Sequence, residues 1–202
     1  MKALSILVIF LLINGVIFPQ DTKQDSKLVI GLYTNVGINH PFPAQRSNTY
    51  YEPDRFYGRG SYSAGIMFTK PISQKYKISV AAVYSVHKIG FKYSMIVSPT
   101  PGIPTENFEV FNVPITISRY LRNNWFLNLG TITDFDVPRN AQYMGPQTGF
   151  GLSLGGGKEF QIKNFTLDIS PNFEIHSIVP FQPRETKERL SVFGIRIGLS
   201  NY

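Results

Sequence analysis

Hydrophobic and polar residues alternate one by one along most of the chain after residue 27. In residues 28–38, Leu28 and Ile30 share one parity with other large apolar residues, while Gly31 belongs to the opposite parity. Successive side chains of a β-strand point to opposite sides of a sheet, so this period of two predicts strands. No helical periodicity appears after residue 27, and the pattern therefore predicts an all-β domain.

The alternation predicts eight strands, and the connections between them differ regularly in length. The strands are expected at residues 28–38, 60–70, 76–88, 108–120, 125–133, 149–160, 164–176 and 190–202. Short connections (71–75, 121–124 and 161–163) alternate with long ones along the chain. Transmembrane barrels join their strands by short periplasmic turns and longer external loops. The spacing thus favours an up-and-down barrel with both termini on the periplasmic side.

The two faces of these strands differ in chemistry. One face carries large apolar residues, and the other carries Gly, Ser, Asn, Thr and isolated charges. An eight-stranded barrel has an interior just wide enough for side chains, so small and polar residues suit the inside and the bulky face would meet lipid. Aromatic residues near strand ends, among them Tyr120 and Trp125, fit interfacial girdles. The expected fold is an eight-stranded antiparallel up-and-down transmembrane β-barrel; a secreted soluble barrel of the lipocalin type is an alternative.

The N-terminus has the pattern of a signal peptide. Lys2 is the only charge in residues 1–20, and apolar character persists to Phe18. The apolar run is shorter than the ~20 residues of a spanning helix, although an uncleaved membrane anchor is the alternative. We expect residues 1–20 to be a cleaved signal peptide, 21–27 a short polar lead, and 28–202 a barrel domain in the bacterial outer membrane.

Composition narrows the class further. Charged residues make up 16% of the chain, against roughly 25% in average soluble domains. The net charge of +7 comes without any Lys/Arg run longer than two residues, so a nucleic-acid partner is not expected. The chain has no cysteine, which excludes both disulfides and the acylated cysteine of a lipoprotein anchor.

Two segments carry a resemblance to a known family. They are FNVPITISRYLRNNWFLNLG at residues 111–130 and the closing LSVFGIRIGLSNY at 190–202. Both resemble the small outer-membrane β-barrel domain family of Bacteroidota, which includes PorT-like proteins. The resemblance implies contact with outer-membrane lipid, insertion by the barrel-insertion machinery, an envelope protein partner, and a role in secretion or envelope assembly. Tyr202 fits a terminal insertion signal, whereas Ser200 stands where a second aromatic is common.

Three charged residues fall on the predicted inward face of the last two strands: Asp168, Glu174 and Arg196. A buried charge is costly unless it is paired, so we expect a structural ion pair between Arg196 and one of the acids. The alternative is a narrow polar conduit, which would make the protein a pore.

Candidate catalytic and nucleotide-binding motifs are weak. His176, Ser177 and Glu174 form a crude hydrolase set, but their spacing matches no hydrolase motif. The segment LGGGK at residues 154–158 is followed by Glu159 instead of the Ser or Thr of a phosphate-binding loop. We therefore expect no catalytic residue, no cofactor and no metal site, with a lipid-modifying hydrolase as the enzymatic alternative.

The first long connection has the composition of a contact surface. Tyr50, Tyr51, Arg55, Phe56 and Tyr57 lie there, and tyrosine and arginine are favoured at interfaces. These five residues are the candidate external-loop contacts, against the alternative of an ordinary solvated loop.

Overall fold

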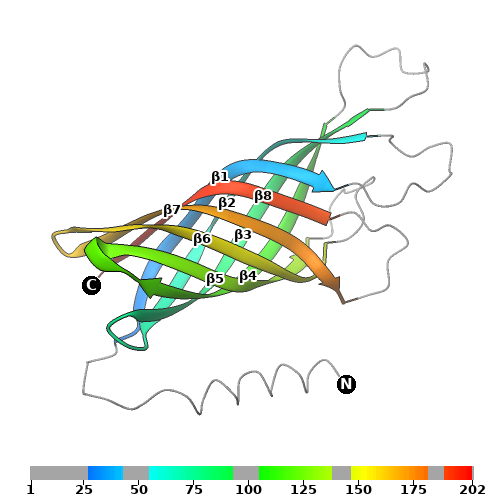
Figure 1. The fold of residues 1–202 in the computed structure, drawn as a ribbon. Helices are drawn as coiled ribbons and strands as arrows, with labels where there is room; N and C mark the ends of the chain where they lie inside the picture. The colour runs from blue at the N-terminus through cyan, green and yellow to red at the C-terminus, as the bar shows by residue number, and fades with distance from the viewer. Residues whose placement is uncertain (1–26, 43–54, 93–104, 138–146, 182–188, 202) are drawn as a thin grey trace.

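Eight strands form a closed barrel in the computed structural model, which describes residues 27–42, 55–92, 105–137, 147–181 and 189–201 (Figure 1). Each strand pairs antiparallel with the next, and the last closes on the first. The strands are β1 (Val29–Phe42), β2 (Arg55–Pro71), β3 (Tyr76–Lys92), β4 (Thr105–Tyr120), β5 (Trp125–Asp136), β6 (Gly149–Ile162), β7 (Phe165–Pro180) and β8 (Arg189–Asn201). The predicted eight-stranded antiparallel up-and-down barrel is confirmed.

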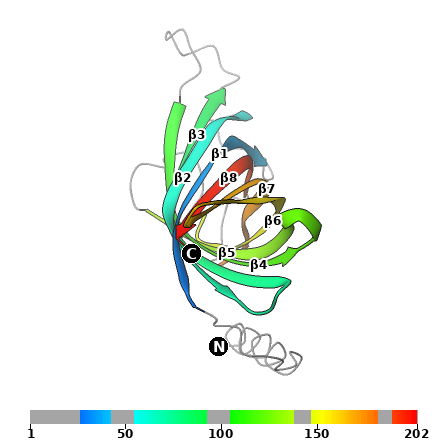
Figure 2. The same ribbon diagram turned by 90° about the vertical axis from the view of Figure 1, so that its left-hand side faces the viewer.

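The barrel is apolar outside and mostly small or polar inside. In β1, Leu32 and Val36 are 63% and 62% exposed, whereas Tyr33 and Asn35 are 7% and 4% exposed. The same alternation runs along the other strands, with Val86 as a buried exception on the outer face. Two views a quarter turn apart show the strands wrapping around one interior (Figures 1 and 2). The assignment of faces from the sequence is therefore correct.

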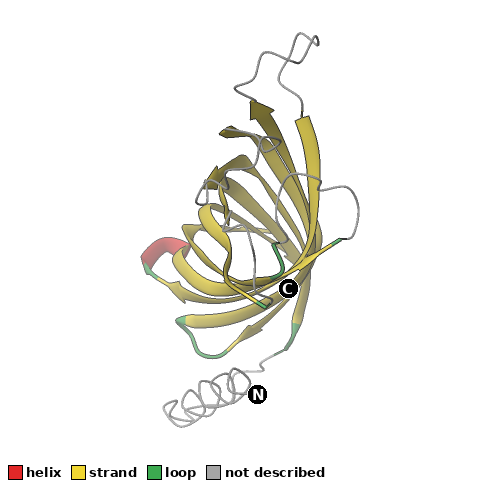
Figure 3. Cartoon of the chain, turned by 90° about the vertical axis from the view of Figure 1, so that its right-hand side faces the viewer, coloured by secondary structure: helices red, strands yellow, loops and turns green. Residues whose placement is uncertain are grey.

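The tight turns β2–β3, β4–β5 and β6–β7 all lie at one end of the barrel (Figure 1). The turn between β4 and β5 holds the short 3₁₀ helix η1 (Arg122–Asn124), drawn as a helix in Figure 3. Asn123 and Asn124 have φ of 61° and 60°, and asparagine is among the residues that enter this left-handed region most readily. No helix among the described residues is long and apolar enough to cross a membrane.

The strands extend further toward the long connections than the sequence pattern predicts. β2 begins at Arg55 instead of residue 60, and β7 continues to Pro180 instead of residue 176. Pairing continues where the alternation is interrupted, because backbone hydrogen bonds do not depend on the polarity of the side chains. Large apolar side chains still face outward in these extensions, as Phe42 and Val179 do.

One consequence is a correction to the predicted loop contacts. Arg55, Phe56 and Tyr57 belong to β2, where they pair with β3, and are not loop residues. Phe56 packs against buried apolar side chains of the interior. A register shift between Gly58 and Gly60 breaks the alternation there, which hid the strand from the pattern. Tyr50 and Tyr51 lie outside the described residues.

The seam between β1 and β8 closes the barrel. Its pairs run from Gly31 opposite Ser200 to Phe42 opposite Arg189. Closure leaves no strand edge along the described ladder, so every neighbouring pair of strands can satisfy its backbone hydrogen bonds.

Candidate functional site

The interior of the barrel divides into three zones along its axis. At the short-turn end lies a cavity of about 460 Å³, here called the vestibule, which reaches the turn residues Ser73 and Gln74. The middle holds a set of hydrogen-bonded polar side chains, here called the central network. Toward the long connections lies an apolar cluster made of Ile89, Phe108, Val110, Leu190 and Val192. Each zone has its own chemistry.

The vestibule contains a tight ion pair. Lys77 Nζ lies 2.8 Å from Glu159 Oε2, and the Tyr120 hydroxyl donates to the same oxygen at 2.5 Å. The Lys77 ammonium also lies 4.4 Å from the centre of the Tyr120 ring. Tyr120 thus points inward, and its assignment to an interfacial aromatic girdle was wrong.

The vestibule also receives two of the three charges that the sequence placed inside. Arg196 Nε lies 3.7 Å from Asp168 Oδ1, a distance that allows charge attraction but is too long for a hydrogen bond. The Arg196 guanidinium is 6.0 Å from the centre of the Phe126 ring. Glu174 belongs to the central network instead, since Tyr33 and Asn172 donate to its Oε1 at 3.3 and 2.8 Å.

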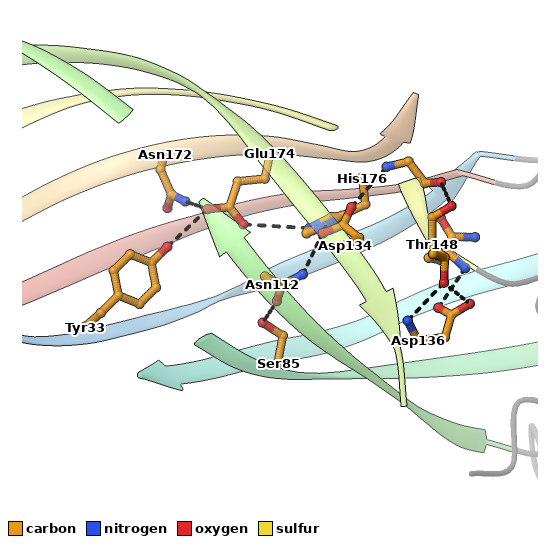
Figure 4. A network of polar contacts seen from close by, with 11 residues as sticks. Tyr33, Ser85, Asn112, Asp134, Asp136, Thr148, Asn172, Glu174 and His176 are labelled. Carbon is orange, nitrogen blue, oxygen red and sulfur yellow. Dashed lines mark hydrogen bonds and ion pairs between the residues drawn. The ribbon is translucent and has the colours of Figure 1, made fainter. Parts of the chain in front are cut away.

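Asp134 is the centre of the central network (Figure 4). Its side chain is fully buried and accepts three hydrogen bonds: from Asn112 Nδ2 at 2.6 Å, from the Ser177 backbone N–H at 3.1 Å and from His176 Nδ1 at 3.1 Å. Ser85 in turn donates to Asn112. A carboxylate held by three donors is well satisfied, so this part of the network is a rigid structural unit.

His176 joins Asp134 to Glu174. Its Nε2 lies 3.7 Å from Glu174 Oε2 and has no hydrogen-bond partner among the described residues. The Ser177 hydroxyl donates to the Thr148 carbonyl at 3.4 Å. A hydrolase would need a nucleophile within hydrogen-bond reach of the histidine base, and the neighbour of Nε2 here is a second acid. The geometry gives the hydrolase alternative no support.

The central network and the apolar cluster close the interior above the vestibule. The His87 ring lies 5.4 Å from the His176 ring and 6.4 Å from the Phe108 ring, measured between centres. Two further cavities border Tyr33, and each holds about 10 Å³. A cavity needs at least about 10–15 Å³ to hold one water molecule. In the described part of the chain, the lumen is therefore packed shut between its two ends.

Sequence reasoning missed two of the interior acids, Asp134 of the central network and Glu159 of the vestibule. Asp134 lies one position beyond the predicted end of the fifth strand, so its inward face was not considered. Glu159 lies inside the predicted sixth strand and has the same parity as Ser153 and Gly157, which face inward. The parity rule alone would have placed Glu159 inside, although it could not have identified Lys77 as its partner.

Comparison with known proteins bears on the fold. No family model matches the chain, and no curated protein sequence matches it significantly. The outer membrane protein OprG from Pseudomonas aeruginosa is similar in structure, with a TM-score of 0.56, 11% identity, and coverage of 87% of this chain and 95% of OprG. The outer membrane protein AlkL, solved in lipid bilayers, has a TM-score of 0.54, 8% identity, and coverage of 91% and 94%. The chain thus has the fold of a small outer-membrane barrel.

Proposed function

We propose that this chain is a non-enzymatic β-barrel of the bacterial outer membrane with a structural or interaction role. The observation that carries the proposal is the band of exposed, large apolar side chains around a closed barrel. It includes Leu32, Ile38, Leu129, Leu154 and Phe193, each more than half exposed. Such a surface is stable in lipid, and a closed barrel satisfies the hydrogen bonding that a hydrocarbon environment demands.

We infer the orientation from the difference between the two ends of the barrel. The tight turns and both ends of the barrel chain face the periplasm, and the long connections face outward, as in transmembrane barrels generally. Residues 1–20 act as a cleaved signal peptide, and insertion uses the barrel-insertion machinery. The resemblance of residues 111–130 and 190–202 to PorT-like barrels supports a role in secretion or envelope assembly, through an envelope protein partner.

A pore is less well supported than a structural role. Between the vestibule and the apolar cluster, the described residues leave small cavities of about 10 Å³ each, which are too small for a hydrated ion. Reconstitution in a planar bilayer would separate the two functions, because a structural barrel gives no steady conductance.

Fractionation tests the proposal directly. The protein should float with outer-membrane vesicles and stay with the membrane after carbonate extraction. N-terminal sequencing of the mature protein should begin near residue 21. Protease added to intact cells should cut in the connections 43–54, 93–104, 138–146 or 182–188, and not in the turns 72–75 or 121–124. Release by carbonate would refute the membrane location, and cleavage in the short turns would invert the orientation.

A further inference from the structure

The vestibule has the size and shape of a small-molecule site. Its volume of about 460 Å³ falls within the roughly 300–1,000 Å³ typical of ligand pockets. Tyr33 borders both of the small cavities above it, and each of these holds only about 10 Å³. Within the part of the chain that the structure describes, the vestibule is therefore closed off from the opposite end of the lumen, and a solute would enter it from the short-turn end.

Two buried polar side chains of the vestibule wall have an unpartnered group that can donate a hydrogen bond. Glu159 already accepts hydrogen bonds from Lys77 and Tyr120. By contrast, Arg196 is 7% exposed and Thr166 is 5% exposed, and among the described residues neither the Arg196 Nε nor the Thr166 hydroxyl has a hydrogen-bond partner. Buried donors that lack an acceptor are costly, so this wall is suited to a ligand that brings acceptor oxygens.

The charges of the vestibule point to the same chemistry. Among the residues that the structure describes, Lys27, Lys77 and Arg196 line it together with two acids, Glu159 and Asp168, which leaves a surplus of one positive charge. Lys27 is exposed and lies two residues before the start of β1, close to the short-turn end. A guanidinium presents a planar fork of donors that matches a carboxylate or a phosphate.

We propose that the vestibule binds a small organic anion, bearing carboxylate or phosphate groups, which enters from the periplasm. Arg196 and Thr166 hold the anionic group, and Lys27 attracts the ligand at the mouth. Asp168 competes with the ligand for Arg196. The entry side rests on the proposed orientation in the membrane, whereas binding itself does not.

Titration calorimetry on the barrel, refolded in vesicles of zwitterionic lipid, tests the site with citrate as the probe and glucose as the neutral control. Citrate should bind and glucose should not. Lys27→Gln should weaken binding roughly twofold to fivefold, as expected for the loss of one exposed charge. Asp168→Asn should strengthen it roughly threefold to tenfold, because it removes a competing carboxylate beside Arg196.

Two further variants change Arg196 itself. Both Arg196→Lys and Arg196→Gln should weaken citrate binding, and Arg196→Gln should weaken it more. Because Arg196 is buried, binding by these two variants is compared only if their barrels fold. If they do not fold, Lys27→Gln and Asp168→Asn alone test the proposal. A citrate heat equal to that of glucose overturns the proposal, and so does an affinity unchanged in both Lys27→Gln and Asp168→Asn. Since the barrel is folded in vesicles beforehand, a negative result leaves the proposed membrane role standing.

Discussion

Replacing Asp134 tests whether the central network stabilises the barrel. Asp134→Ala leaves the Asn112 amide, the Ser177 N–H and His176 Nδ1 without their acceptor in a site that is fully closed to solvent. Each unsatisfied buried donor costs about 1–3 kcal/mol. The three losses are not additive, because the neighbouring side chains share one cavity and can relax, so the expected total is about 3–5 kcal/mol.

Asp134→Asn should have a stability between those of the wild type and Asp134→Ala. Its carbonyl oxygen can still accept from Asn112 and His176, but its amide group would face the Ser177 N–H, donor against donor. The expected cost is about 1–2 kcal/mol, the loss of one hydrogen bond together with one unsatisfied group. Thr131→Ala, on the outer face of the same strand, is the matched control and should change stability by less than about 0.5 kcal/mol.

The assay is equilibrium urea unfolding of the barrel from lipid vesicles. Trp125 is the only tryptophan in the chain and is 53% exposed on the outer face, so its fluorescence reports the transfer from lipid to water. The wild type should be the most stable, followed by Asp134→Asn and then Asp134→Ala. The dependence of the unfolding free energy on urea concentration should be the same for all three. The free energy of unfolding of Asp134→Ala could instead lie within about 0.5 kcal/mol of that of the control. In that case water replaces the carboxylate at little cost, and the network does not stabilise the interior.

Three further substitutions test other parts of the barrel by the same measurement. Ile115→Arg, on the outer face, should cost ~2–4 kcal/mol, whereas Thr116→Arg, which points into the vestibule, should fold with a smaller loss; equal losses would contradict the assigned faces. Gly157→Ala should destabilise by about 1–3 kcal/mol because its Cβ would lie 2.1 Å from a backbone oxygen, while Gly156→Ala meets a side-chain methyl at 2.9 Å and should be milder. Tyr120→Phe should cost about 1–2 kcal/mol through its lost hydrogen bond to the vestibule carboxylate, and no change would indicate that water takes its place.

The fold could be predicted from the sequence because lipid and a narrow lumen impose opposite chemistry on alternate residues. The strand ends at the tight turns were located to within a few residues, since Pro71 and the Asn123–Asn124 pair mark them. At the strand ends next to the long connections, the predicted strands were too short. In β2, the register shift between Gly58 and Gly60 exchanges the residues that face inward with those that face outward. A rule based on strict alternation therefore cannot predict the strand beyond this shift.

The partners of the interior charges could not be predicted in the same way. Parity places Asp168, Glu174 and Arg196 inside, but the choice of partner depends on the register between two strands joined by a long connection. In the structure Asp168 is opposite Gly198, next but one to Arg196, while Glu174 is opposite Val192, further along the strand. The length of a connection does not fix that register, so both acids were equal candidates from the sequence.

The seam between β1 and β8 makes the folded barrel a cycle in which no strand is first or last. Gly31 lies opposite Ser200, so the two ends of the barrel chain are neighbours at the same rim. A short linker could join them, and a cut in any of the four long connections would then yield a circularly permuted chain with an identical ladder of strand pairs. The order in which the strands emerge during export is thus a property of the covalent chain alone. The strand pairs of the native barrel do not depend on which strand comes first.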